Sequence, residues 1–222
     1  MSIFSDIFVS LTTGLVLGGG MCLISFFIDK TFCKDSFEIV CKQTPELYID
    51  GIFANLTNMF LIGPITYSVI EYCFIDKTTY YIQPLNLVSI LLFHNCGYYI
   101  THFMMHKPLL CKIHNFHHKF DKFLLPSIGN AVSPNEFIIA YMSPFIISAI
   151  YLGPNQTTFI TSISIISILN MAIHCRELEL IEWPKIFVSP SQHIEHHKIK
   201  TKHYAAPLLN LDYIFNGKNK DN

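Results

Sequence analysis

Charged side chains are scarce in this sequence of 222 residues. Asp, Glu, Lys and Arg supply 14% of it, against about 25% in ordinary soluble domains. Apolar residues supply 51%, and so few charges could not cover the surface of a soluble enzyme. The net charge is only -1 and there is no basic stripe, so the composition also excludes a nucleic-acid-binding protein and a disordered chain. A membrane protein is the class that remains.

Several local signals are missing as well. The seven cysteines include no Cys-x-x-Cys pair, so the sequence predicts neither a disulfide framework nor a thiolate zinc site. There is no Gly-rich phosphate loop and no haem, flavin or nicotinamide motif. No Lys or Arg precedes Lys30, which is unlike the start of a cleaved signal peptide.

Long runs without a charged residue are what the sequence does contain. They cover 7–28, 51–70, 78–101 and 137–175, and Gly153-Pro154 divides the last run. Because a helix of about 20 residues crosses a hydrocarbon core, these runs predict five spans. A buried core helix is the alternative for any one run, but five in so short a chain favour membrane spans. The predicted fold is an all-α polytopic membrane protein with about four to five spans, because the run 78–101 is polar for a lipid-facing helix.

The basic residues give an orientation. Lys and Arg are absent before the first run, and their number then alternates between high and low from one loop to the next. The positive-inside rule assigns the richer loops to the cytosol. We therefore expect the loop 107–136 and the C-terminal tail on the cytosolic side.

Eight of the 11 histidines fall into three short groups. The groups are His102 with His106, His114 with His117 and His118, and His193 with His196 and His197. Residues three or four apart on a helix share a face, so we expect the imidazoles of each group to point the same way. The two spans within 137–175 return the chain to the side it left, which brings all three groups to one membrane face.

This histidine content indicates metal binding. Neutral imidazoles suit zinc, copper, iron and nickel. Eight or more exceed the ligands of one ion, so the sequence predicts two ions with three to five imidazoles each. The first group is not the zinc-protease motif His-Glu-x-x-His, because Phe103 stands where that motif needs its glutamate.

At these residues the sequence resembles the sterol desaturase and fatty acid hydroxylase superfamily of membrane di-iron oxygenases. Its boxes HxxxH, HxxHH and HxxHH match in order and spacing, and the resemblance covers about residues 85–217. Further matches are Pro134-Asn135-Glu136, His174, His203-Tyr204-Ala205 and the segment from Leu211 to Gly217.

The resemblance implies two iron ions that use dioxygen to hydroxylate or desaturate a lipid, either a sterol or a fatty acyl chain. The implied metal ligands are His102, His106, His114, His117, His118, His174, His193, His196 and His197. No catalytic residue beyond these ligands is expected. Electrons would come from a separate cytochrome b type donor and its NAD(P)H reductase. A non-catalytic membrane protein that holds zinc is the competing interpretation.

Four positions depart from the family pattern. Phe103 replaces the usual Arg, Asn95 an acidic residue, Ser133 a His and His203 an Asn. These changes spare the ligands but alter their surroundings, and so bear on substrate and rate. The candidate orienting residues or extra ligands are His203, Asp212, Glu195 and Asn95. For Glu195 and Asp212, solvated surface is an equal alternative.

Three segments are predicted along the chain. Residues 1–83 form N-terminal membrane spans, 84–217 a histidine-box catalytic domain and 218–222 a short lysine-containing tail. Lys218 and Lys220 resemble the dilysine retrieval signal of endoplasmic reticulum membrane proteins, with a merely solvated end as the alternative. We therefore expect an integral membrane protein of that organelle, with the histidines and C-terminus in the cytosol.

Overall fold

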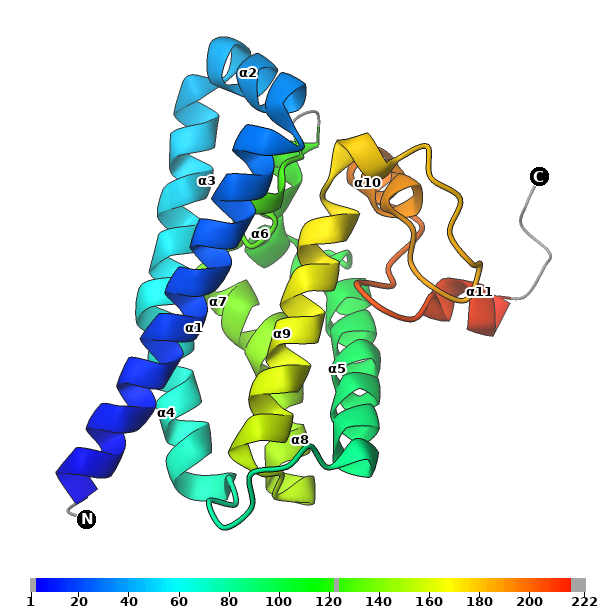
Figure 1. Ribbon diagram of the computed structural model, residues 1–222. Helices are drawn as coiled ribbons and strands as arrows, with labels where there is room; N and C mark the ends of the chain where they lie inside the picture. The colour runs from blue at the N-terminus through cyan, green and yellow to red at the C-terminus, as the bar shows by residue number, and fades with distance from the viewer. Residues whose placement is uncertain (1–2, 122–123, 217–222) are drawn as a thin grey trace.

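The protein is built from helices throughout the part of the chain that the structure describes. This computed structural model describes residues 3–121 and 124–216, and those ranges contain no β-strand (Figure 1). The α-helices are α1 (Ile3–Thr31), α2 (Lys34–Gln43), α3 (Pro45–Thr57), α4 (Gly63–Phe74), α5 (Pro84–Met105), α6 (Cys111–His114), α7 (Pro134–Glu136), α8 (Ser143–Leu152), α9 (Gln156–Ile173), α10 (Pro190–Ile199) and α11 (Leu211–Asn216).

Within the described ranges, four helical segments are long and apolar enough to cross a membrane. They are Phe4–Thr31, Pro45–Phe74, Pro134–Leu152 and Gln156–Ile173. The second joins α3 to α4 through a π-helical stretch, and the third joins α7 to α8 in the same way. These segments contain the apolar runs expected as the first, second, fourth and fifth spans. The prediction of an all-α membrane protein with about four to five spans is therefore confirmed.

The fifth long helix, α5, is more polar than the other four. It has 22 residues and lies alongside α8 and α9, but its inward face carries His94, Asn95 and His102, each 1% exposed. The run predicted as a span from residue 78 becomes helical only at Pro84, because the preceding segment is tied to the turn between α8 and α9. There, the Asn155 side chain donates to the carbonyl oxygen of Tyr81 at 2.6 Å.

That turn makes a tight hairpin of α8 and α9. Gly153 ends α8 with φ +50°, a left-handed conformation that a glycine adopts without steric cost. Asn155 then begins α9, because its side-chain oxygen accepts the backbone N–H of Thr158 at 2.9 Å. The hairpin predicted at Gly153-Pro154 is confirmed.

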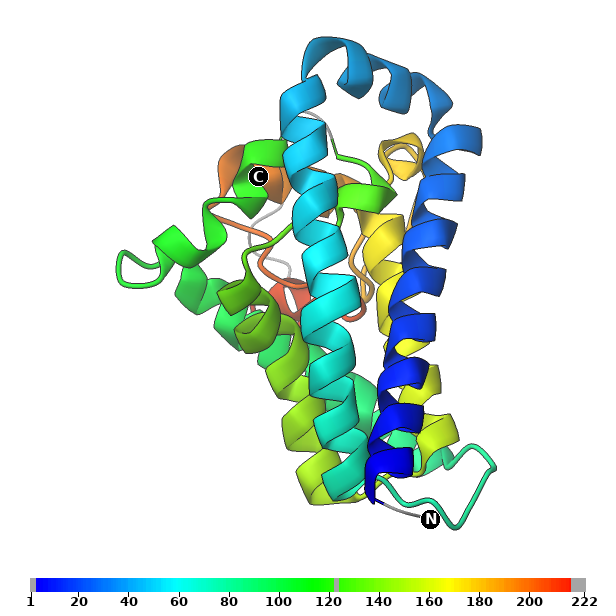
Figure 2. The same ribbon diagram turned by 90° about the vertical axis from the view of Figure 1, so that its left-hand side faces the viewer.

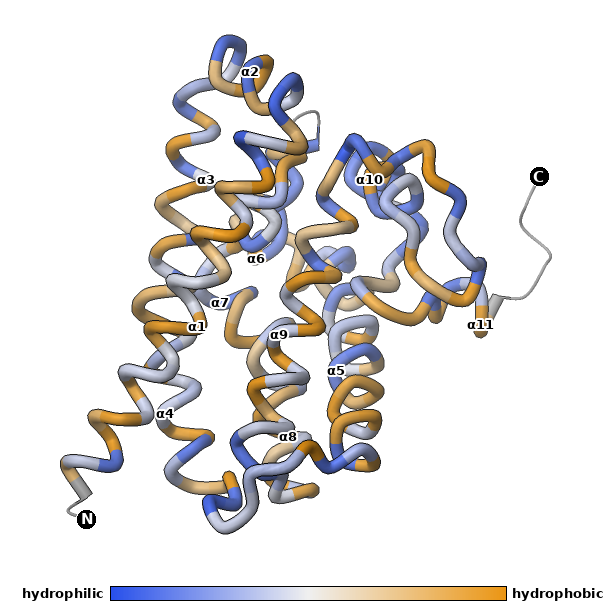
Figure 3. The backbone as a smooth tube through the Cα atoms, viewed as in Figure 1, coloured by the Kyte–Doolittle hydropathy of each residue, from blue (hydrophilic) through white to orange (hydrophobic). Residues whose placement is uncertain are grey.

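Small residues let α1 pack closely against the helix that contains α4. A Cβ atom on Gly14 would lie 2.7 Å from the Cα of Pro64, and one on Gly18 would overlap the carbonyl oxygen of Met59. Backbones can approach this closely only where side chains are absent, as is common between membrane helices. Elsewhere on α1, large apolar side chains such as Phe8 and Phe27 are exposed, and Figure 3 shows hydrophobic residues along the length of this helix.

The short helices gather at one end of the molecule. Figures 1 and 2 both show α6 and α10 towards the end capped by α2, whereas the N-terminus and the loop 75–83 lie at the other end. The C-terminal ends of α5 and α9 point towards α6 and α10. The tail 217–222, with its two lysines, lies outside the described residues.

Candidate metal centre

Nine histidines converge where the ends of α5 and α9 meet α6 and α10. Eight of them are buried, and His106 is partly buried. The spacing of the second histidine box predicted a single helix, and this prediction is wrong. The helix α6 ends at His114, whereas His117 and His118 lie on a separate 3-10 turn, His117–Phe120. The third box lies on α10, which begins with a capping box at Ser189.

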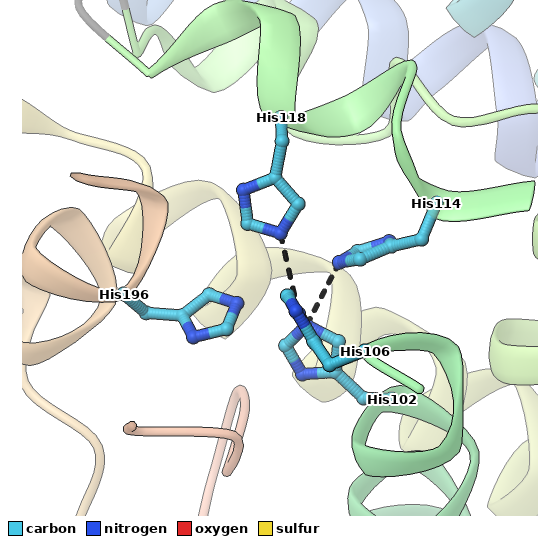
Figure 4. A group of neighbouring side chains, drawn as sticks. All are labelled: His102, His106, His114, His118 and His196. Atoms are coloured by element: carbon cyan, nitrogen blue, oxygen red, sulfur yellow. Dashed lines mark hydrogen bonds between the residues drawn. The ribbon is translucent and has the colours of Figure 1, made fainter. Parts of the chain in front are cut away.

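Five of these imidazoles form the first group. Its members are His102, His106, His114, His118 and His196, and their ligand atoms lie within 4.8 Å of one another. Figure 4 shows the five rings pointing towards a common centre from α5, α6, the 3-10 turn and α10. The Nε2 atom of His102 lies 3.0 Å from that of His114 and 3.3 Å from that of His106.

Four further imidazoles form the second group. They are His117, His174, His193 and His197, all buried, and their ligand atoms also lie within 4.8 Å of one another. The Nε2 atom of His193 lies 3.1 Å from that of His174 and 3.3 Å from that of His197.

The two His-His pairs in the boxes are divided between the groups. His118 joins the five-histidine group and His117 the four-histidine group, and likewise His196 joins the first and His197 the second. Neighbouring side chains on the same short helical segment thus point to different centres, so the expectation that the imidazoles of each box point the same way is wrong for the second and third boxes. This division places the two groups side by side, with the rings of His118 and His197 only 5.0 Å apart between centroids.

Backbone carbonyls fix the protonation of several rings. The Nδ1–H groups of His102, His174 and His196 each donate at 2.7 Å, to the carbonyl oxygens of Tyr204, Asn170 and Lys202 in turn. A carbonyl oxygen can only accept, so Nδ1 carries the proton and Nε2 keeps a lone pair. Such outer contacts also hold a metal-binding ring in orientation.

The inward nitrogens fit a bound cation. His102 and His114 both use Nδ1 for outward hydrogen bonds, so their Nε2 lone pairs face each other at 3.0 Å. Metal–nitrogen bonds of about 2.1 Å place two ligand nitrogens about 3.0 Å apart at a right angle and about 3.4 Å apart at the tetrahedral angle. The separations of 3.0–3.3 Å in both groups match these values. The buried Nε2 atoms of His117 and His196 have no hydrogen-bond partner within the described part of the chain, and a metal bond would satisfy them.

The surroundings keep the imidazoles neutral. Burial, reinforced by neighbouring histidines, lowers the pKa of His118 from 6.5 to about 2. Burial lowers the pKa of His174 to about 4, and for His106 the nearby Lys200 adds to the same effect, again giving a pKa of about 4. A neutral imidazole is the form that binds a metal.

Glu136 is a site residue that the sequence analysis noted only as part of a family match. Its Oε1 atom accepts from the Nδ1–H of His114 at 2.6 Å, and both side chains are buried. Ser133 places Glu136 by accepting its backbone N–H at 3.2 Å, and the Ser133 hydroxyl donates to the carbonyl oxygen of Ile113. The signal in the sequence was this Ser-Pro-Asn-Glu helix start, which begins 15 residues beyond His118, the last residue of the second histidine box.

The candidate orienting residues from the sequence lie farther out. Glu195 is 41% exposed and pairs with Lys202 and His203, so neither Glu195 nor His203 points into a histidine group. Asp212 accepts the backbone N–H of Ala205 at 2.7 Å, next to the Tyr204 carbonyl that binds His102. Asn95 instead fastens α5 to the backbone of Leu209, with hydrogen bonds of 2.9 and 3.2 Å.

Apolar helices with buried histidines at one end define an integral membrane protein with a histidine metal site. Residues 87–217, more than half of the chain, match the model of the fatty acid hydroxylase family. The chain therefore belongs to that family, within the sterol desaturase and fatty acid hydroxylase superfamily, and the resemblance noted in the sequence is confirmed. Comparisons with curated proteins and with solved structures gave no match.

Proposed function

We propose that the protein hydroxylates or desaturates a lipid, with one iron ion held by each histidine group and dioxygen as co-substrate. Bound iron would supply the activation of dioxygen that attack on an unactivated C–H bond requires, since amino-acid side chains cannot supply it. The observation that carries the proposal is the convergence of nine histidines, in two groups of five and four, within a fatty acid hydroxylase domain.

The residues around the ions have separate tasks in this proposal. The carbonyl groups of Lys202 and Tyr204 keep Nδ1 of His196 and His102 protonated, so that Nε2 stays free to bind metal. Glu136 holds His114 in the same way. Burial of all ligands except His106 keeps bulk water away from the reacting bond.

An apolar cavity beneath the histidines supports a lipid substrate. The cavity has a volume of ≈ 90 Å³ and is lined mostly by apolar residues of α1, α4, α8, α9 and the π-helical stretches, with His94, Asn130 and Asn170 among its polar members. Asn170 lies one turn from His174 and accepts its Nδ1–H. An engineered protein cavity that holds benzene has a volume of about 150 Å³. The cavity found here is smaller, which favours a stretch of acyl chain over a fused ring system as its occupant. We propose that the apolar part of the substrate enters here from the bilayer.

The electron supply is also part of the proposal. Family membership supports a separate cytochrome b type donor with an NAD(P)H reductase. Exposed basic residues surround the histidine end, among them Lys107, Lys198 and Lys200. Lys107 and Lys200 act electrostatically on His106, the least buried ligand. A donor with an acidic surface would be attracted to this side.

The proposed location is the endoplasmic reticulum, with the histidine end in the cytosol. The distribution of Lys and Arg supports the orientation. Changing Lys218 and Lys220 to Ser is expected to let the protein reach the Golgi or the cell surface, as seen by microscopy. Unchanged reticular localisation of the double variant would mean that the tail is only a solvated end.

Metal and dioxygen measurements test the proposed activity. The full-length protein, purified in detergent or nanodiscs, is expected to contain two iron ions and to consume dioxygen when electrons and lipid are supplied. Mass spectrometry of cell lipids with and without the protein then identifies the lipid that gains oxygen or loses hydrogen. Zinc in the histidine groups, with no iron and no lipid-dependent uptake, would support the competing zinc-holding protein instead.

A further inference from the structure

A third group of side chains of the types that bind metals lies outside the histidine centre. Cys33, at the corner between α1 and α2, is 0% exposed, and Cys175, just after α9, is 2% exposed. Their sulfur atoms lie 3.1 Å apart, although the residues are 142 positions apart in the chain. Oε2 of Glu177 lies 3.6 Å from the sulfur of Cys175.

These distances fit a tetrahedral zinc ion. Zinc binds thiolate sulfur at about 2.3 Å and carboxylate oxygen at about 2.1 Å, so a shared ion places sulfur and oxygen about 3.6 Å apart. The contact between Cys175 and Glu177 already has that length. Two sulfurs on the same ion lie about 3.8 Å apart, so those of Cys33 and Cys175 need to separate by only about 0.7 Å.

A second contact orients the carboxylate. The Ser36 hydroxyl, on α2, donates to Oε1 of Glu177 at 2.6 Å, which leaves Oε2 turned towards the sulfur of Cys175. Metal-binding carboxylates are commonly held by such an outer hydrogen bond. The backbone is fixed too: Cys33 N–H donates to the carbonyl oxygen of Ile28, and Cys175 N–H to that of Ala172.

We propose that Cys33, Cys175 and Glu177 bind one zinc ion, with water as the fourth ligand. Both sulfurs bind as thiolates, so two protons are released to solvent when the ion binds. The ion would tie the corner between α1 and α2 to the segment that directly follows His174. Soft thiolate donors suit zinc, and a sulfur-containing donor set distinguishes this site from the histidine groups, which offer nitrogen only. The sequence analysis predicted no thiolate zinc site because neither cysteine belongs to a Cys-x-x-Cys pair.

Metal analysis of cysteine variants tests this zinc site. The full-length protein is expected to hold one zinc ion per chain that disappears in Cys33→Ser and in Cys175→Ser, while metal in the histidine groups remains. Cys41→Ser, on α2 but outside the group, is the matched control and should keep its zinc. Ser36→Ala is expected to weaken zinc binding about 10- to 100-fold. Zinc content unchanged in both cysteine variants overturns the proposal.

Cobalt provides a readout on the unaltered chain, in case the cysteine variants do not fold. Co²⁺ loaded into the metal-depleted protein is expected to give a sulfur-to-cobalt charge-transfer band, which histidine ligands cannot produce. Absence of this band overturns the proposal. A zinc-free chain whose mass is lower by two hydrogen atoms also overturns it, because that mass would show a disulfide between Cys33 and Cys175. Iron content and dioxygen uptake are measured on the same samples, so failure of the zinc site is distinguishable from failure of the proposed oxygenase.

Discussion

At the contact between α1 and the helix that contains α4, the backbones approach through glycine, whereas the histidine end buries polar rings and a carboxylate. Gly14 and Gly18 let backbones touch, and nothing in that contact needs a ligand. At the other end, buried nitrogens of His117 and His196 have no hydrogen-bond partner among the described residues. Unpaired buried polar groups are costly. We infer that the glycine contact is stable through its own packing, while the histidine end depends on bound metal.

Loss of a metal ligand should give the largest effect. We expect His117→Ala, in the four-histidine group, and His196→Ala, in the five-histidine group, to reduce turnover by more than about 100-fold, because even outer contacts to a ligand contribute that much. Both variants should still insert into the membrane, since α1–α4 is untouched. His203→Asn, a histidine outside both groups, serves as the control. Turnover and metal content are measured together, and near-normal turnover in both alanine variants would falsify their assignment as ligands.

Acid should destabilise the histidine end of the metal-free protein. The pKa values of His106 and His174 are lowered from 6.5 to about 4 by burial, so the unfolded chain binds more protons than the folded one between these values. Burial of these imidazoles in their neutral form therefore contributes fully to the free energy of unfolding above about pH 6.5. This contribution is lost as the pH falls towards 4. Because several buried imidazoles contribute, we expect the unfolding temperature to fall steeply in this range. A flat profile from pH 6.5 to 4 would contradict neutral burial of these rings.

Glu136→Gln should weaken the histidine end without removing a ligand. The glutamine keeps the shape but replaces the carboxylate that accepts the Nδ1–H of His114 at 2.6 Å by an amide. We expect metal affinity to fall about 10- to 100-fold. Glu195→Gln is the matched control, because that carboxylate is 41% exposed and bonds only to surface neighbours. Equal metal affinities in the two variants would show that the contact with Glu136 does not matter.

A single methyl group should disturb the packing of α1. In Gly18→Ala, the new Cβ would overlap the carbonyl oxygen of Met59, so we expect a loss of about 1–3 kcal/mol in the free energy of unfolding. Gly20→Ala, on the same helix, meets nothing within 4 Å and should cost nothing. Unfolding in detergent measures both. A similar loss in both variants would show that the contact with Met59 is not the cause, because helix propensity by itself favours alanine over glycine.

Much of the histidine end could be predicted from local sequence patterns. Box spacing brought eight histidines forward as candidates, the family resemblance added His174, and the uncharged run 137–175 predicted the hairpin that returns the chain to them. Local spacing misjudged the second box, however. The helix α6 ends at His114, and a change to a 3-10 turn lets His117 and His118 point to different groups.

The sequence by itself determined the membrane class and the supply of ligands, because hydropathy and histidine spacing are properties of neighbouring residues. Only the tertiary structure decided which imidazoles share a centre, that Glu136 meets His114, and that Cys33 meets Cys175 across 142 positions. The physical reason is that these contacts depend on how the helices pack. Close approach of α1 to α4 at glycine, and of α9 to α10 beyond the hairpin, brings together side chains whose separation in the chain carries no information about distance.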